Sequence, residues 1–181
     1  NELDVKSEQN THGVAPLCHR CVTLIQKGDL VEIVVNRKQE KIDHVTQLPL
    51  RVSLLRQIEI WYQKRPDAIT GICLVELDGF SNINDTVGHA TGDSILFEIA
   101  RRLERYEAHR FKLVRLHGDE FALAVTKMES HEEIWDVSKW IADQFEAPFS
   151  TQKGAVFLTP SIGMSLNINT TGDPVSLLES A

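Results

Sequence analysis

FKLVRLHGDEFALAV, residues 111–125, is the stretch that decides the fold. Two apolar runs with a spacing of two flank a polar middle, which is the pattern of two β-strands. His117, Gly118 and Asp119 between them form a hairpin-turn signal, and glycine supplies either a positive φ or room for another molecule's backbone or phosphate. Asp119 and Glu120 are adjacent carboxylates that repel each other, so a positive charge is expected beside them. A solvated acidic turn is the plain alternative.

A second acidic element lies upstream, at the end of the apolar run of residues 69–77. Glu76 and Asp78 are two residues apart, so we expect them on one face of a strand. In a split β-α-β-β-α-β arrangement this strand would lie centrally, beside the first strand of the hairpin, with its acids near the hairpin tip. Oxygen ligands without cysteine or histidine favour Mg²⁺ or Mn²⁺, ions that usually hold substrate phosphates.

The order of elements from residue 69 onward predicts the fold class. After the strand comes a loop rich in Gly, Asn and Asp over residues 79–92, and Asp93 is expected to cap the amphipathic helix that follows. With the hairpin, a second helix and a last strand, the order reads β-α-β-β-α-β. We therefore predict an α/β protein of the α+β kind, with a ferredoxin-like antiparallel sheet and helices on one face.

The later boundaries rest on local signals. Ser130 and Glu133 match a capping box for the second helix. Residues 155–166 read as one strand, in which Pro160 and Gly163 favour a sheet edge or a bulge. Asp173 precedes Pro174 and opens a further helix.

The N-terminal part is less regular. Residues 17–26 predict a short helix, and residues 30–48 fit either a connecting helix, including a coiled coil, or a strand over residues 31–35. Pro49 suits the first turn of the next helix. We assign residues 1–42 to an N-terminal extension and residues 43–181 to the domain.

Composition narrows the functional classes. The 181 residues carry a net charge of −7, which argues against a nucleic-acid or anionic-membrane binder. No apolar run approaches the ~20 residues that span a bilayer, and no signal-peptide pattern is visible. Cys18 and Cys21 are either ordinary thiols or zinc ligands, whereas Cys73 fits a core position. A reducing, cytoplasmic setting is expected for the domain, although the full protein could be anchored upstream.

The residue 79–92 segment and its flanks could bind a nucleotide. Its glycines offer backbone N–H groups to phosphates. Asn84 and Asp93 could hydrogen-bond a base, and an aspartate, which only accepts, suits the N1–H and amino edge of guanine. A turn residue and a helix N-cap are the plain readings of these two positions.

Four motifs together resemble a known family. VELDGFSNINDTVGHATGDSIL, RLHGDEFAL and SIGMSL occur in this order, and DHVTQLPLR resembles the family's opening motif D-x-L-T-G-L-P-N-R. They resemble the GGDEF domain of diguanylate cyclases, over about residues 43–181. The family joins two GTP molecules into cyclic di-GMP with release of pyrophosphate, across a dimer of two such domains.

The resemblance implies roles for particular residues. Mg²⁺ or Mn²⁺ would be the cofactor and GTP the substrate, with no nucleic acid as a partner. The implied metal ligands are Glu76, the Leu77 carbonyl and Asp119; Asn84 and Asp93 read guanine; Gly79, Phe80 and Gly118 lie at the phosphates; and Asp119 and Glu120 serve catalysis, Glu120 at the metal or the 3′-hydroxyl.

The chain also departs from the family pattern. Glu76 replaces an aspartate, His117 a glycine and Ser81 a lysine, so weak turnover is expected. Gln47 and Leu50 depart from the opening motif, and Ala108 and Phe111 replace the ends of the product-inhibition motif R-x-x-D. Such departures resemble GGDEF domains that precede a phosphodiesterase (EAL) domain. The alternative function is therefore an inactive GTP-sensing or dimerising module, with an EAL domain downstream.

Overall fold

The computed structural model describes residues 22–27, 30–35, 40–106, 110–167 and 173–181, and the chain divides into residues 1–39 and 40–181. In the first unit, β1 (Val22–Lys27) and β2 (Leu30–Val35) form an antiparallel hairpin. The helix predicted over residues 17–26 is therefore wrong where it is described, because β-branched and apolar residues dominate β1. The strand alternative for residues 31–35 is confirmed, and Cys18 and Cys21 lie outside the described residues.

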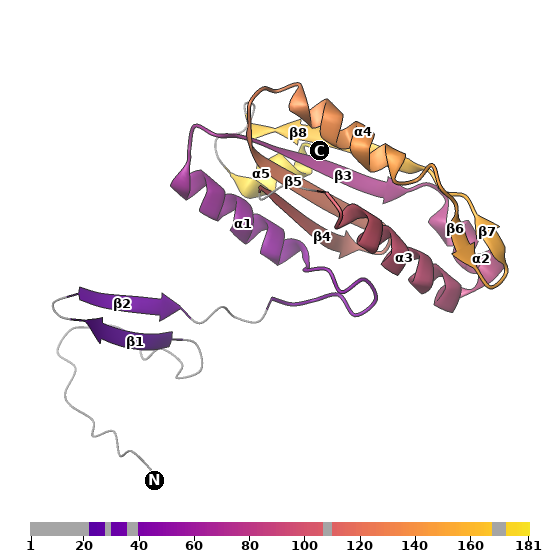
Figure 1. The fold of residues 1–181 in the computed structure, drawn as a ribbon, viewed down its shortest axis with the longest axis horizontal. Helices are drawn as coiled ribbons and strands as arrows, with labels where there is room; N and C mark the ends of the chain where they lie inside the picture. The colour runs from indigo at the N-terminus through magenta and orange to yellow at the C-terminus, as the bar shows by residue number, and fades with distance from the viewer. Residues whose placement is uncertain (1–21, 28–29, 36–39, 107–109, 168–172) are drawn as a thin grey trace, which may run out of the picture. The chain divides into compact units, whose positions relative to one another are not determined.

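The second unit is built on a four-stranded antiparallel sheet in the order β4-β5-β3-β8 (Figure 1). The strands are β3 (Ile69–Leu77), β4 (Phe111–His117), β5 (Glu120–Met128) and β8 (Pro160–Leu166). The predicted hairpin and the α+β class are confirmed. One neighbour is different from the prediction, since β3 pairs with β5, the second strand of the hairpin, and not with β4.

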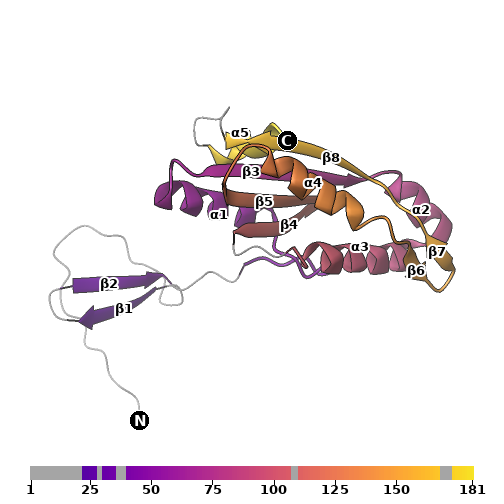
Figure 2. The same cartoon turned by 45° about the horizontal axis from the view of Figure 1, so that its top comes forward.

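Helices cover both faces of the sheet, so the prediction of helices on one face is wrong (Figure 1 and Figure 2). Cys73, Val75 and Leu77 of β3 face α3 (His89–Leu103) and α4 (Glu133–Asp143). Ile72 of β3 faces α1 (Arg51–Lys64) and α5 (Pro174–Glu179). Burial confirms Cys73 as a core residue and raises the pKa of its thiol to about 12.

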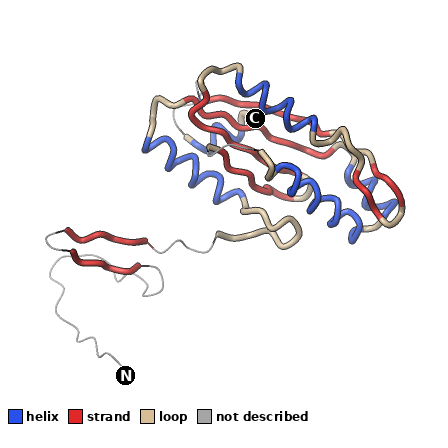
Figure 3. Tube along the Cα trace, viewed as in Figure 1, coloured by secondary structure: helices blue, strands red, loops and turns tan. Residues whose placement is uncertain are grey.

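The segment predicted as a loop over residues 79–92 is mostly helical (Figure 3). It forms α2 (Phe80–Val87) and the first turn of α3, separated by Gly88 at φ 87°. Phe80 is buried and Ile83 packs beside it, so core contacts outweigh the loop-like composition. Asp93 consequently lies inside α3 and does not cap it, which corrects the prediction.

Three further boundaries differ from the prediction. Helix α1 begins at Arg51, after Pro49, which pairs with Ile42 in an isolated bridge; residues 40–48 are not helical. Helix α4 begins at Glu133, whose side chain accepts from the backbone N–H of Glu129, so no capping box with Ser130 forms.

The strand predicted over residues 155–166 is two strands. β7 (Gly154–Val156) pairs with β6 (Phe149–Thr151), whereas β8 joins the main sheet as an edge strand, as its proline predicted. Asp173 does cap α5, accepting from the backbone N–H groups of Val175 and Ser176 at 3.2 and 2.9 Å. Across the described ranges, no helix is both long and apolar enough to cross a bilayer.

Candidate functional site

The predicted tip is a tight turn between β4 and β5. Gly118 has φ +50°, and a Cβ placed on it would meet no atom within 4 Å, so the turn is open to solvent. Arg115 of β4 fixes the turn from below, because its Nε and Nη2 both donate to the Gly118 carbonyl, with the Nε–O distance 3.0 Å. The tip is therefore held by a side chain that the sequence analysis did not single out.

Arg115 also joins the turn to the start of the domain. Its Nη1 lies 2.7 Å from Asp43 Oδ1, and Arg115 is only 8% exposed. The same oxygen accepts from the backbone N–H and hydroxyl of Thr46, each at 2.8 Å. Partial burial raises the pKa of Asp43, but the hydrogen bonds from Thr46 and Arg115 outweigh it and hold that pKa below its ordinary value. We call Asp43, Thr46, Arg115 and Gly118 the latch.

Two carboxylates of neighbouring strands face each other beside this turn. Glu76 of β3 is directly opposite Glu120 of β5 in the register of the sheet. Directly opposed residues of an antiparallel pair share a face, and like charges there destabilise the pairing. Asp119 follows in the turn, one residue from Glu120. We call Glu76 and Glu120 the acidic pair, and its excess negative charge favours a bound cation.

The residues present offer oxygen ligands to a divalent cation. No three His, Cys, Asp or Glu side chains gather into a metal-binding group in the part of the chain that the structure describes. A divalent ion such as Mg²⁺ can take as few as one or two carboxylates, with water and substrate phosphates completing its shell. The Asp78 N–H bonds the Thr159 carbonyl at 2.9 Å, so Leu77 and Pro160 form a non-hydrogen-bonded pair. The Leu77 carbonyl therefore points away from β8, toward the side of Glu120.

Asp78 does not join the acidic pair, although the sequence analysis grouped it with Glu76. Its carboxylate accepts from the hydroxyls of Thr159 at 2.6 Å and Ser161 at 2.7 Å. These hydrogen bonds, led by the one from Thr159, hold the pKa of Asp78 below its ordinary value. The strand ends at Leu77, so the two-residue alternation no longer applies to residue 78.

The second group of predicted residues lies on α2 and α3. Gly79, at φ 67°, turns the chain from β3 into α2, and Phe80 is buried under it. A Cβ on Gly92 of α3 would collide with Asn84 Oδ1, so the Asn84 amide lies against the helix turn that carries Asp93. Asn84 of α2 therefore contacts α3 at Gly92, the residue that precedes Asp93.

His117, which stands where the family has a glycine, lies largely in solvent beside the turn. Its side chain is 75% exposed, and its Nε2 lies 3.1 Å from Glu120 Oε2, whereas Glu120 is 27% exposed. The ring therefore contacts one member of the acidic pair from the solvent side.

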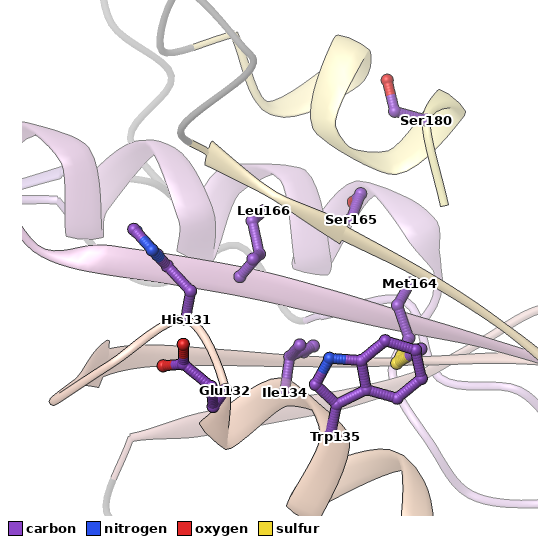
Figure 4. Close-up of a pocket in the computed structure, with 8 residues that line it drawn as sticks. All are labelled: His131, Glu132, Ile134, Trp135, Met164, Ser165, Leu166 and Ser180. Carbon is purple, nitrogen blue, oxygen red and sulfur yellow. The ribbon is translucent and has the colours of Figure 1, made fainter.

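A cavity elsewhere in the domain has no part in this group. It has a volume of about 440 Å³ and lies between the start of α4, β8 and the end of α5 (Figure 4). Trp135 and Met164 line it together with Ile134 and Leu166, and its rim carries His131 and Glu132. None of the predicted site residues lines it.

Comparisons with known proteins agree with this arrangement. The family model described as "Diguanylate cyclase, GGDEF domain" matches residues 40–181. The chain is 41% identical over 105 residues to diguanylate cyclase DgcN of Escherichia coli K12, covering 56% of this chain and 26% of DgcN. It is 31% identical over 126 residues to the bifunctional diguanylate cyclase/cyclic di-GMP phosphodiesterase MucR of Pseudomonas aeruginosa, covering 68% of this chain and 18% of MucR.

A solved structure supports the same assignment. The GGDEF domain of PA1120 (TpbB or YfiN) from Pseudomonas aeruginosa superposes with a TM-score of 0.72 at 27% identity, covering 77% of this chain and 83% of that one. The chain spans only about a quarter or less of the curated relatives DgcN and MucR. From the family match over residues 40–181, together with the sheet order and the hairpin tip, the chain belongs to the GGDEF domain family of diguanylate cyclases.

Proposed function

We propose that this domain binds GTP together with Mg²⁺, or Mn²⁺, and condenses two GTP molecules into cyclic di-GMP at a low rate. Diguanylate cyclases of this family use a divalent metal ion. The observation that carries the proposal is the acidic pair, Glu76 opposite Glu120, beside Asp119 in an open turn. Such an excess of carboxylates at an exposed strand end is expected where a cation and phosphates bind.

The reaction would be two successive phosphoryl transfers. The 3′-hydroxyl oxygen of one GTP bonds to the α-phosphorus of the other, the bond from that phosphorus to the bridging oxygen breaks, and pyrophosphate leaves. A bound divalent ion would supply Lewis-acid stabilisation of charge on the α-phosphate. Glu76, Asp119 and the Leu77 carbonyl would hold that ion, and Glu120 would receive the hydroxyl proton or bind the ion. Gly79, Phe80 and Gly118 would offer backbone groups to the phosphates.

Guanine selection would come from Asn84 and Asp93. The contact of Asn84 with Gly92, the residue before Asp93, supports this pairing, because an amide and a carboxylate together can both donate and accept. The carboxylate accepts from the N1–H and amino group of guanine, and adenine lacks both donors at that edge. We therefore expect GTP to be preferred over ATP.

Each domain would present one GTP, so the active form would be a homodimer. The relative MucR is named as both a cyclase and a phosphodiesterase. By extension we propose an EAL domain downstream of this one in the full protein.

Low turnover is expected from two features of the site. Glu76 is one methylene longer than the family's aspartate, and a displacement of about 1 Å can cost ~100-fold in rate. His117 contacts Glu120 at 3.1 Å and so competes for the carboxylate that would assist the reaction.

The His117 contact also supports the second candidate, a GTP-sensing module without turnover. The experiment that separates the two is chromatography of products formed from Mg²⁺-GTP by the wild-type protein and Asp119→Ala. Cyclic di-GMP from the wild type alone supports the cyclase. If the wild type binds GTP in calorimetry but forms no product, the sensor is supported. If the wild type shows neither GTP binding nor product, the proposed nucleotide site is wrong.

A further inference from the structure

A second cavity, of about 280 Å³, lies where α1 ends and the hairpin opens. Its α1 residues have helical spacing, so they form one face of that helix. Phe111 pairs with Val125 beside it, whereas His117 and Glu120 pair at the other end of the hairpin. The cavity is therefore distant from the acidic pair. Its lining consists of Gln57, Ile60, Trp61, Lys64, Arg65, Arg110, Thr126 and Lys127.

The lining is strongly cationic in an acidic protein. Of the eight described residues that line it, four are Lys or Arg and none is Asp or Glu, although the chain carries a net charge of −7. No ion pair to a carboxylate is formed by these four within the described ranges. By contrast, the structure gives a carboxylate partner to Arg101, Arg102, Lys112 and Arg115.

The helix dipole accounts for two of the four cationic residues but not for the other two. Lys64 and Arg65 stand at the C-terminal end of α1, where the helix dipole favours cations. Arg110 and Lys127 belong to the hairpin and have no such reason to gather there.

The backbone holds these two hairpin residues together. Arg110 Nη1 donates to the Lys127 carbonyl, and the Thr126 N–H donates to the Arg110 carbonyl at 2.9 Å. The β3–β5 register shifts so that Met128 and Thr126 pair with consecutive residues, which leaves Lys127 as a bulge at φ 58°. A bulge changes the direction of the side chain that it carries, and Lys127 here lines the cavity.

We propose that this cavity binds a compact phosphate-bearing anion, with its phosphate at Lys64, Arg110 and Lys127 and its organic part, if any, at Trp61. Guanidinium and ammonium groups are the usual protein partners of phosphate oxygens. A volume of about 280 Å³ lies below the ~300–1,000 Å³ of pockets that enclose drug-sized ligands, so the ligand is small. The proposal is independent of the GTP site.

The test is a calorimetric titration of the 181-residue chain with inorganic phosphate and with phenyl phosphate, in chelator and low salt. Without a divalent ion the acidic pair repels phosphates, so the GTP site contributes nothing. We expect one binding event per chain that weakens as salt rises. Tighter binding of phenyl phosphate than of inorganic phosphate, lost in Trp61→Leu, would assign the organic part to Trp61.

Two double variants of equal charge decide the location. Lys64→Gln with Lys127→Asn removes two lining cations, and asparagine tolerates the positive φ of residue 127. This variant should bind about 10-fold more weakly, because each exposed charge-assisted contact contributes up to roughly fivefold. Lys139→Gln with Lys153→Asn, on α4 and in the β6–β7 turn, should bind as the wild type does.

Equal affinity of both double variants, or no binding of either anion at millimolar concentration, overturns the proposal. Sedimentation with anionic vesicles that requires Lys64 and Lys127, without binding of soluble phosphates, also overturns it in favour of a lipid surface. Melting curves of both double variants establish that the fold is retained, since all four substituted side chains are exposed.

Discussion

The latch and the acidic pair both involve the β4–β5 hairpin, the latch through Arg115 and Gly118 and the acidic pair through Glu120, and their charges are arranged in opposite ways. The latch buries Arg115 and satisfies it with Asp43 and the Gly118 carbonyl. The acidic pair sets Glu76 directly opposite Glu120 with an exposed histidine as its contact. A group whose charges are balanced internally stabilises the fold, whereas a group with excess charge gains free energy only when a ligand arrives. The latch is therefore a structural contact, and the acidic pair is the proposed metal site.

The largest expected effect comes from breaking the latch. Arg115→Met leaves the partly buried Asp43 without its cation and should destabilise the domain by about 3 kcal/mol. Urea unfolding of the wild type and the variant measures this. The double variant Arg115→Met with Asp43→Leu removes both charges and should recover much of the loss. A single variant as stable as the wild type would show that the latch is not a stabilising contact.

The second-largest expected effect is on GTP affinity, when the Asp93 carboxylate of α3 is removed. Asp93→Ala should lower the affinity for Mg²⁺-GTP by ~30-fold, about 2 kcal/mol, because a charged acceptor of guanine is lost. Its unfolding free energy should hardly change, since Asp93 is exposed. Unchanged calorimetric affinity would place the base elsewhere. Asp85→Ala, exposed on the neighbouring α2, is the matched control and should bind GTP normally.

Shortening one acid tests whether metal geometry limits the rate. Glu76→Asp should raise cyclic di-GMP formation by ~10-fold, which corresponds to about 1.4 kcal/mol of barrier. The measurement is steady-state product formation from Mg²⁺-GTP. Wild-type turnover that Glu76→Asp does not improve would mean that glutamate is a competent ligand. No product from either protein would favour the sensor.

A smaller effect is expected inside the turn that presents the latch aspartate. Gln47 adopts φ 62°, and its side-chain amide donates to the His44 carbonyl at 2.8 Å. A non-glycine residue in this conformation costs roughly 1–2 kcal/mol. Gln47→Gly should therefore stabilise the domain by about 1 kcal/mol in urea unfolding, while Gln47→Ala, which keeps a Cβ, should not. Equal effects of the two substitutions would exclude backbone strain as the cause.

The smallest expected effect is a gain in the free energy of unfolding, whereas most substitutions lower it. Glu76→Gln removes one of two opposed like charges and should stabilise the metal-free domain by about 0.5 kcal/mol. The same variant should lose metal-dependent GTP binding. Loss of stability in chelator would mean that Glu76 has a structural partner, and the contrast with the latch would then fail.

The sequence predicted the hairpin well because its signals are local. Period-two alternation and a glycine fix β4, β5 and the Gly118 turn without any distant contact. The acids Glu76 and Glu120 also meet, although the assumed neighbour of β3 was wrong. In the observed order β3 lies beside β5, and this brings Glu76 opposite Glu120 more directly than pairing with β4 would.

The predictions from sequence were wrong or incomplete where contacts between residues far apart in the chain outweigh local conformational preference. The segment after β3 has the composition of a loop, yet Phe80 enters the core and makes it helical. Asp93 has the chemistry of an N-cap, but Gly88 and His89 begin α3 a turn earlier. The latch was missed because Asp43 and Arg115 are 72 residues apart, and no periodic pattern links such positions.

The contact between Gly92 and Asn84 has a consequence for how such domains diverge. Any side chain at position 92 competes with the Asn84 amide for the same space, so the two positions cannot vary independently. Under the guanine-reading role proposed for Asn84, a lineage that keeps that role would also keep glycine at position 92. A lineage that abandons recognition is free to enlarge residue 92 once residue 84 has become smaller. The residue types at positions 84 and 92, read together from a sequence, would therefore indicate whether a domain of this kind has kept the proposed base recognition.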